Sequence, residues 1–185
     1  MSIEADWDAT AAVERCAVIG WRGPAWRMHR QRYPATDPGG ARRVSGRFHR
    51  GLDRFPEDET WPALYLALSR DVAIGELVRH LRPELLPALN DYRITELDVS
   101  LQAVLDCRDP SALGVTLDAL LAEGNYSLTQ RLGAAALARE VEGLIAPSAT
   151  RLGDTLVLFP PRLRGRSQLA VVAYLEPRLY VARTE

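Results

Sequence analysis

Residues 39–81 contain the side chains that an enzyme needs to hold a phosphorylated nucleotide and to break a bond in it. The segment begins with an arginine- and glycine-rich loop, Gly39–Gly51, whose glycines would let the backbone approach a ligand closely. A short apolar run with Tyr65 inside it comes next, and a helical pattern that carries Glu76 ends the segment. Guanidinium groups suit phosphate, so these residues predict an anion-binding catalytic site.

The basic residues of the chain are concentrated in and just before this loop. All 23 residues counted as Lys or Arg are arginine, and ten of them lie between Arg15 and Arg54. Only Asp37 and Asp53 oppose them there, so this stretch carries a charge of +8 while the whole chain carries −1. Such clustering is unfavourable unless an anion binds. It predicts either a phosphate-rich ligand or a solvated basic face without a dedicated ligand.

The composition is that of a globular protein. With 185 residues, 47% of them apolar, the chain is expected to form one domain over residues 15–185 after a lead-in at 1–14, which is loose or forms a short helix. No apolar stretch approaches the roughly 18–20 residues that span a bilayer. The acidic N-terminus lacks a secretory pattern, so we expect a cytoplasmic location and no membrane association.

Metal chemistry is not expected. The histidines, His29, His49 and His80, have no metal-ligand spacing, and neither have the two cysteines, Cys16 and Cys107. In a cytoplasmic protein these cysteines are expected to be free thiols that are buried or incidental.

The apolar runs and their boundaries predict the elements that position the chemistry. Gly23-Pro24 separates the first two expected strands, and the full set is 16–21, 25–29, 63–68, 92–101, 104–107, 144–149, 155–159 and 169–175. Helices are expected over 70–81, from Asp109-Pro110 to 123 as one short helix or two pieces, and from a capping box at Ser127–Gln130 to 142. Strands outnumber helices without regular alternation, which predicts an α+β fold: one compact domain with a mixed or antiparallel sheet flanked by helices.

Two candidate residues each allow two interpretations. On a helical wheel Glu76 lies opposite the apolar stripe formed by Ile74, Leu77, Val78 and Leu81. It is therefore a solvated residue unless its side of the helix lines a cleft. Ser148, in Ala-Pro-Ser-Ala, is either a hydroxyl placed for binding or a turn serine that caps its own backbone.

The order of several motifs resembles the RES-domain family, bacterial toxins of RES–Xre toxin–antitoxin modules. The resemblance extends from about residue 21 to about residue 160, and the residues that carry it are Trp26-Arg27, Ser45-Gly46-Arg47-Phe48, Leu64-Tyr65 with Ser69, Ala73–Val78 and Pro147-Ser148. It implies a fold like that of ADP-ribosyltransferases. It also implies cleavage of the nicotinamide–ribose bond of NAD, the substrate, with water or phosphate as acceptor.

The resemblance also implies a role for each site residue. Glu76, Arg47 and Ser148 would be catalytic, and Glu76 would stabilise the positive charge that develops on the ribose. Arg27 and Arg47 would hold the pyrophosphate. Tyr65 would stack on the nicotinamide, and Ser148 would hydrogen-bond the ribose or the carboxamide.

The resemblance further implies a protein partner, an Xre-type helix-turn-helix antitoxin, through which alone the toxin would meet nucleic acid. Two other functions stay open. One is transfer of ADP-ribose to a protein, because loop details set the acceptor. The other is a non-catalytic arginine-rich module that binds nucleic acid, although the near-neutral net charge and the few aromatics near the arginines count against it.

The sequence departs from the family's pattern at the site edges. The loop reads Ser45-Gly46-Arg47-Phe48-His49 where Gly-Gly-Arg-Trp-Asn is usual, and Gly153-Asp154-Thr155 stands where an asparagine motif is usual. These changes bear on acceptor choice and on activity. The acidic stretch Asp53–Trp61 has no predicted function.

Overall fold

The computed structural model describes residues 7–80 and 87–176, which form an α+β domain around one sheet. The strands are β1 (Val18–Arg30), β2 (Leu64–Ala67), β3 (Tyr92–Asp106), β4 (Gly143–Pro147), β5 (Asp154–Leu158) and β6 (Gln168–Leu175). The helices are α2 (Ala9–Arg15), α3 (Gly39–Arg43), α4 (Arg70–His80), α5 (Leu117–Leu121) and α6 (Ser127–Ala138), with 3-10 turns at Glu57–Glu59, Pro87–Asp91 and Pro160–Arg162. The predicted fold class is confirmed.

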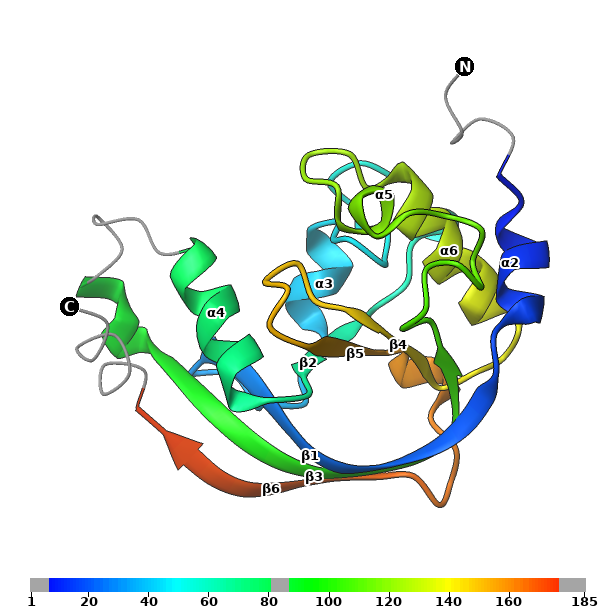
Figure 1. Ribbon diagram of the computed structural model, residues 1–185. Helices are drawn as coiled ribbons and strands as arrows, with labels where there is room; N and C mark the ends of the chain where they lie inside the picture. The colour runs from blue at the N-terminus through cyan, green and yellow to red at the C-terminus, as the bar shows by residue number, and fades with distance from the viewer. Residues whose placement is uncertain (1–6, 81–86, 177–185) are drawn as a thin grey trace.

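The strand pairings join into a ring. The order is β1-β2-β5-β4-β3-β6, and β1 also pairs with β3, so five strands close on themselves while β6 extends the sheet beside β3. The β3–β4 pair is parallel and the other pairs are antiparallel, which makes the sheet mixed. Figure 1 shows β1, β3 and β6 as a long curved layer, with the helices on its concave side.

The first strand runs through the expected break at Gly23-Pro24, so the prediction of two strands there was wrong. Gly23 and Pro24 pair with Val99 and Asp98 of β3. Among the described residues β1 meets β2 only at Trp26, so its other edge is open at Pro24. An edge strand tolerates a proline because a missing N–H on the open side costs no ladder bond.

The third strand is likewise one element of 15 residues where two were predicted. The carboxylate of Glu142 accepts hydrogen bonds from the backbone N–H groups of Gln102 (2.6 Å) and Ala103 (2.8 Å). It also accepts from Arg164 N (2.8 Å) and from the Ser167 hydroxyl. Burial alone would raise the pKa of Glu142, but these hydrogen bonds outweigh burial and lower it. A buried carboxylate thus satisfies the backbone where β3 passes from one partner to the next, and the strand continues.

Three helix predictions need correction. Residues after Asp109-Pro110 form turns, and the helix α5 begins after Thr116, whose hydroxyl caps Ala119 N (3.1 Å). Ser127 is not a cap: its own N–H donates to the Asn125 side chain (3.0 Å), so the predicted capping box is wrong. The helix α6 ends at Ala138, four residues before the expected end. The short helix α3 lies within the stretch expected to be loop.

Two large packed clusters form most of the core, and a small third one lies under α4. The larger lies between the sheet and helices α2 and α6 and includes Phe48, Leu132 and Phe159. The second includes Leu66, Leu97 and other buried strand residues. Trp7 and two residues of α2 belong to the larger cluster, and the boundary expected after residue 14 falls inside this helix. The short-helix alternative for the lead-in is therefore the one observed over Ala9–Arg15.

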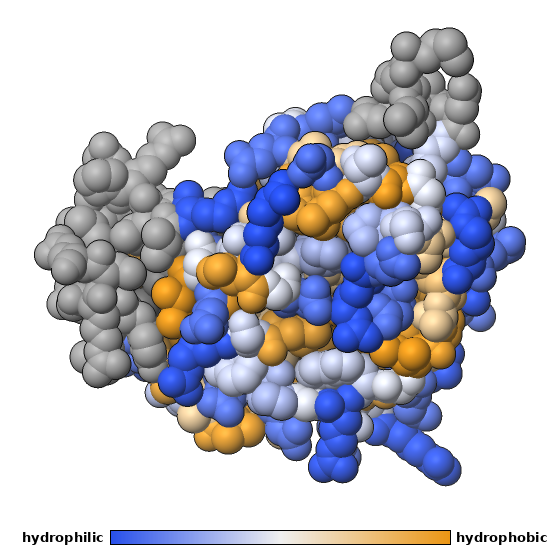
Figure 2. Space-filling view, viewed as in Figure 1, coloured by the Kyte–Doolittle hydropathy of each residue, from blue (hydrophilic) through white to orange (hydrophobic). Residues whose placement is uncertain are grey.

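The surface is mixed in polarity. Figure 2 shows hydrophilic and hydrophobic side chains intermingled on the face that carries the helices. Within residues 7–80 and 87–176, no helix combines the length and the apolar character that crossing a membrane requires.

Candidate active site

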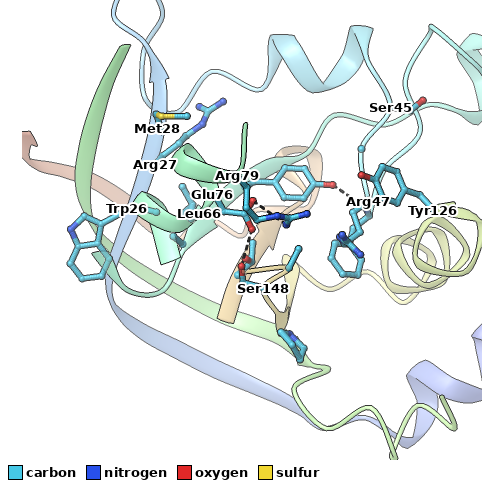
Figure 3. A pocket seen from close by; sticks show the side chains of 18 residues that line it. Trp26, Arg27, Met28, Ser45, Arg47, Leu66, Glu76, Arg79, Tyr126 and Ser148 are labelled. Atoms are coloured by element: carbon cyan, nitrogen blue, oxygen red, sulfur yellow. Dashed lines mark hydrogen bonds and ion pairs between the residues drawn. The ribbon is translucent and has the colours of Figure 1, made fainter. Parts of the chain in front are cut away.

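A cavity of about 380 Å³ lies between α4, the loop that follows α3 and the end of β4. All five site residues predicted from the sequence line it: Arg27, Arg47, Tyr65, Glu76 and Ser148. Residues up to 121 positions apart in the chain thus converge on one hollow of the size that ligand pockets have. In Figure 3, Glu76 and Ser148 point toward each other, Arg47 and Tyr126 lie to one side of them, and Arg27 and Met28 lie to the other.

Glu76 faces the cavity because α4 packs through the side of the helix that was expected to be solvated. Val72 and Ala73 are buried against Trp26 and Ala67, while Ile74 of the expected stripe is only half-buried. The side chains of Leu77, Val78 and Leu81 lie outside the described residues. Of the predicted core stripe only Ile74 can be compared, and it is less buried than Val72 and Ala73 on the other side. The interpretation of Glu76 as a cleft residue is the one that the geometry supports.

Local contacts fix where α4 begins and how closely it packs against the loop after β4. Ser69 caps the helix by accepting a hydrogen bond from Val72 N (3.1 Å), a contribution of about 1 kcal/mol. Gly75 allows close packing, because a Cβ there would lie 3.1 Å from Thr150 Cγ2 and 3.0 Å from Leu152 Cδ1. Glu76, the next residue, therefore sits directly beside the loop that carries Ser148.

Ser148 holds the carboxylate of Glu76. Its hydroxyl donates to Glu76 Oε1 (2.8 Å) and lies 2.9 Å from Thr150 Oγ1. Because the single serine proton goes to the carboxylate, the Thr150 hydroxyl must donate to Ser148, and Thr150 N donates as well (3.1 Å). With 1% of its surface exposed, Ser148 is a buried, satisfied hydroxyl that orients Glu76. The interpretation of Ser148 as a turn serine accounts for its bonds to Thr150 but not for its bond to Glu76.

Arg79 is a site residue that sequence reasoning missed. It lies three positions after Glu76 on α4, and its Nη1 is 3.8 Å from Glu76 Oε2. Its Nη2 contacts Glu123, which anchors the guanidinium from outside the cavity. The i, i+3 spacing of an acid and an arginine on a helix was the available signal. The carboxylate of Glu76 is thus placed between a hydroxyl and a cation.

Arg47 lies on the opposite wall and is held from behind. Its Nη1 donates to the carbonyls of Leu120 (2.9 Å) and Ala122 (3.2 Å) at the end of α5. Its guanidinium carbon lies 5.2 Å from the centre of the Tyr126 ring, which also lines the cavity. All hydrogen bonds from Arg47 to described residues use Nη1, so the remaining N–H donors are available to a ligand.

Tyr65 fixes the loop that carries Arg47. Its hydroxyl oxygen accepts from Phe48 N (2.9 Å) and lies 2.8 Å from His49 Nδ1. His49 Nε2 is 2.8 Å from the Val44 carbonyl, which can only accept, so Nε2 carries the proton and Tyr65 donates to Nδ1. Burial raises the pKa of Tyr65 and lowers that of His49, which keeps both neutral. His49, a departure from the family's pattern, therefore completes a buried hydrogen-bonded pair.

Helix α6 supports the same loop from the core side. Gln130 Nε2 donates to the Gly46 carbonyl (3.0 Å), and a Cβ at Gly133 would lie only 2.1 Å from the Phe48 carbonyl oxygen. The backbone of the loop therefore rests directly on the helix. Ser45 ties the other side of the loop, because its N–H and its hydroxyl both donate to Asp53 Oδ1 at 2.7 Å.

Arg27 reaches the cavity from β1. Its guanidinium donates to the carbonyls of Ala35 and Asp37 (2.8 Å), in the turn that precedes α3. Burial lowers its pKa to about 10 against the opposing effect of Asp37, so Arg27 keeps its charge at neutral pH. A partly buried cation at the edge of a cavity suits an anionic group of a ligand.

The acidic stretch after the loop explains part of the charge clustering. Arg42 pairs with Glu57 (2.6 Å), Arg50 with Glu59 (2.7 Å), and Arg54 lies 3.7 Å from its neighbour Asp53. The stretch that had no predicted function therefore supplies counter-charges to the outer arginines. The arginines in this part of the loop therefore do not form a basic surface without counter-charges.

The remaining predictions concern residues that stay away from the cavity. Asp154 does not line it; burial raises the pKa of Asp154, and its charged neighbours are Arg108 and Asp106. Cys16 and Cys107 are free and buried, as expected. No group of three or more His, Cys, Asp or Glu side chains within the described residues could hold a metal ion.

The chain is similar to known proteins in sequence family and in fold. A search of curated proteins finds no match. Among solved structures, a chain of the crystal structure of the M. tuberculosis MbcT-MbcA toxin-antitoxin complex is similar, with a TM-score of 0.78 and 28% sequence identity. The alignment covers 94% of this chain and 95% of that one. The sequence also matches the RES domain over residues 24–176, most of its length. The chain therefore belongs to the RES domain family.

Proposed function

We propose that this protein is the toxin of a toxin–antitoxin pair and that it breaks the nicotinamide–ribose bond of NAD. The observation that carries the proposal is the convergence of Glu76, ordered by Ser148, with Arg27 and Arg47 around one cavity. The similarity to the MbcT toxin of the MbcT-MbcA complex supports the toxin assignment. By the same similarity the partner is an antitoxin, for which we keep the Xre-type helix-turn-helix protein that the family resemblance implies.

The chemistry follows from the charge that bond cleavage creates. When the C1′–N1 bond breaks, its electron pair leaves with nicotinamide and the ribose ring becomes positively charged. Glu76 would stabilise this charge more strongly than it stabilises the ground state, which lowers the barrier. Water or phosphate then forms a C1′–O bond and releases a proton, giving ADP-ribose or its 1-phosphate ester.

The arginines would hold the two phosphates of the substrate. Arg27 and Arg47 lie on different walls of the cavity, and both keep guanidinium N–H donors that described residues do not use. Tyr126, which packs on Arg47, adds an aromatic surface beside the predicted one of Tyr65. The neutralised outer arginines argue against the alternative of a basic module that binds nucleic acid.

Release of nicotinamide by the purified protein tests the proposal. Incubation with NAD should release nicotinamide, and Glu76→Gln, which can still accept the Ser148 proton, should lower the rate by about 10²–10³-fold. Glu57→Gln, which changes an exposed glutamate paired with Arg42, is the matched control and should keep the rate. Absence of release by the wild type, or equal release by Glu76→Gln, would exclude the proposal.

The acceptor is decided by the products of the same assay. Free ADP-ribose indicates water, and a phosphorylated product that requires phosphate in the buffer indicates phosphorolysis. Labelled NAD added to a cell extract should give no labelled protein band. Such a band would instead support the alternative, transfer of ADP-ribose to a protein.

A further inference from the structure

A second depression adjoins the cavity of Glu76. It has a volume of about 480 Å³ and lies between the end of β1 and the segment that leads into and through α3. Arg27 and Met28 line both the cavity of Glu76 and this depression, so the two hollows lie next to each other along β1. We name it the arginine groove, and its charged lining residues are Arg27, Arg30, Arg32, Arg43 and Asp37.

The arginine groove has an excess of positive charge. Four guanidinium groups face a single carboxylate, that of Asp37, which already accepts a hydrogen bond from Gly39 N (2.8 Å). His29 adds no charge at neutral pH, because burial lowers its pKa. The groove therefore carries three positive charges more than its own acid can balance.

The groove arginines differ from their neighbours in how they are paired. Arg32 lies over the Tyr33 ring at 4.9 Å, and Arg30 donates to the Tyr92 hydroxyl (3.3 Å). The guanidinium of Arg43 makes no hydrogen bond or ion pair with any residue in the described part of the chain; only its backbone carbonyl accepts one, from Asp53 N (3.1 Å). The next residue back, Arg42, is paired with Glu57 at 2.6 Å. The chain thus supplies acids to the outer arginines but leaves those of the groove for an external anion.

The position of the groove indicates which part of a ligand it would meet. This step rests on the proposed function: with the nicotinamide ribose at Glu76 and a phosphate at Arg27, the adenosine end extends past Arg27. A cavity of about 380 Å³ is near the small end of the range for ligand sites, so a second hollow suits the second nucleoside. Adenosine itself is uncharged, however, so with Asp37 and the phosphate at Arg27 counted, two of the four groove arginines would stay unbalanced.

We propose that the arginine groove binds a phosphate on the adenosine ribose, so that the protein prefers NADP to NAD. A phosphate monoester carries a charge of about −1.5 to −2 at neutral pH, which matches most of the excess. Arginine is the side chain that accommodates the 2′-phosphate of NADP in other nucleotide sites, through paired charge-assisted hydrogen bonds. Arg30, Arg32 and Arg43 are the residues that would provide them.

Binding to the full-length Glu76→Gln protein tests this proposal without turnover. Isothermal titration should give a Kd for NADP about tenfold lower than that for NAD. Arg43→Ala should remove most of this difference by weakening NADP binding, with a much smaller effect on NAD. Arg42→Ala, one residue away on α3 but outside the groove, is the matched control and should preserve the difference.

The possible results separate the groove from the reaction. Equal affinity for NADP and NAD, or equal loss in Arg43→Ala and Arg42→Ala, would overturn the groove proposal even if NAD is cleaved. Binding of a random DNA duplex that displaces NADP and depends on Arg43 would overturn it in favour of nucleic acid. Failure of the wild type to cleave either nucleotide would overturn the proposed function, while the ratio of the two affinities would still decide the role of the groove.

Discussion

Glu76 and Arg47 face the same cavity from walls of different construction. Glu76 lies on α4, which rests on a small cluster that contains only Ala67, Val72 and Ala73 as buried members. Arg47 lies in a loop whose next residue, Phe48, belongs to the larger core cluster. Few buried residues thus lie under the helix that carries Glu76, whereas the loop that carries Arg47 is packed directly on the main core.

This difference separates chemistry from stability. The groups that hold Glu76 are a hydroxyl and a cation that themselves line the cavity, Ser148 and Arg79. The groups that hold Arg47 are backbone carbonyls, a helix surface and a buried Tyr–His pair. We expect changes near Glu76 to act first on rate, and changes behind Arg47 to act first on folding.

The largest effect on stability should come from Gly133→Ala. A Cβ at this position would lie 2.1 Å from the Phe48 carbonyl oxygen, so α6 and the loop would have to move apart. Overpacking against backbone should lower the free energy of unfolding by about 3 kcal/mol. Urea denaturation measures it as a lower midpoint. Gly165→Ala, where nothing lies within 4 Å of the added Cβ, is the control, and equal midpoints for the two variants would show that the wall is not rigid.

A smaller effect is expected from Tyr65→Phe, which keeps the ring and removes the hydroxyl. Phe48 N and His49 Nδ1 then lose their partner inside a buried site, which should cost about 1–3 kcal/mol of unfolding free energy. Nicotinamide release at saturating NAD should fall less than in Glu76→Gln, because the ring that faces the cavity stays. A variant of unchanged stability but with a rate as low as that of Glu76→Gln would instead make the hydroxyl a catalytic group.

Much of the sheet could be predicted from the sequence, because four of its strands, β2, β4, β5 and β6, are short apolar runs. The last three strands were found in this way, with bounds that differ by one or two residues. The breaks expected inside β1 and β3 were wrong for reasons that lie far away in the chain. An open edge tolerates Pro24, and the carboxylate of Glu142 satisfies the middle of β3.

The site residues were found through resemblance to a family, and their geometry could not be derived from local pattern. The helical wheel placed Glu76 on the solvated side, but α4 packs through Val72 and Ala73, which lie on that same side. Hydrophobic periodicity therefore does not predict the orientation of a helix that lies beside a cavity. The pairing of Tyr65 with His49 depends on two segments that meet only in the folded chain. The charge cluster likewise needed the structure to separate paired arginines from those of the groove.

The smallest predicted effect is a pH dependence of stability that comes from His49 in the wall of Arg47. Burial is the main cause that lowers the pKa of His49; hydrogen bonds to the Val44 and Ala41 carbonyls and the charge of Asp53 oppose it. As pH falls below the ordinary histidine pKa of about 6.5, the unfolded chain binds a proton before the folded one does, so stability decreases. One such group contributes a slope of at most about 1.4 kcal/mol per pH unit. His29, whose pKa burial also lowers, adds a second contribution of the same sign.

The variant His49→Asn should therefore reduce the loss of stability against urea between neutral and mildly acidic pH without abolishing it. An unchanged pH profile in this variant would show that His49 does not titrate with folding, and the difference between the two walls would then rest on packing alone.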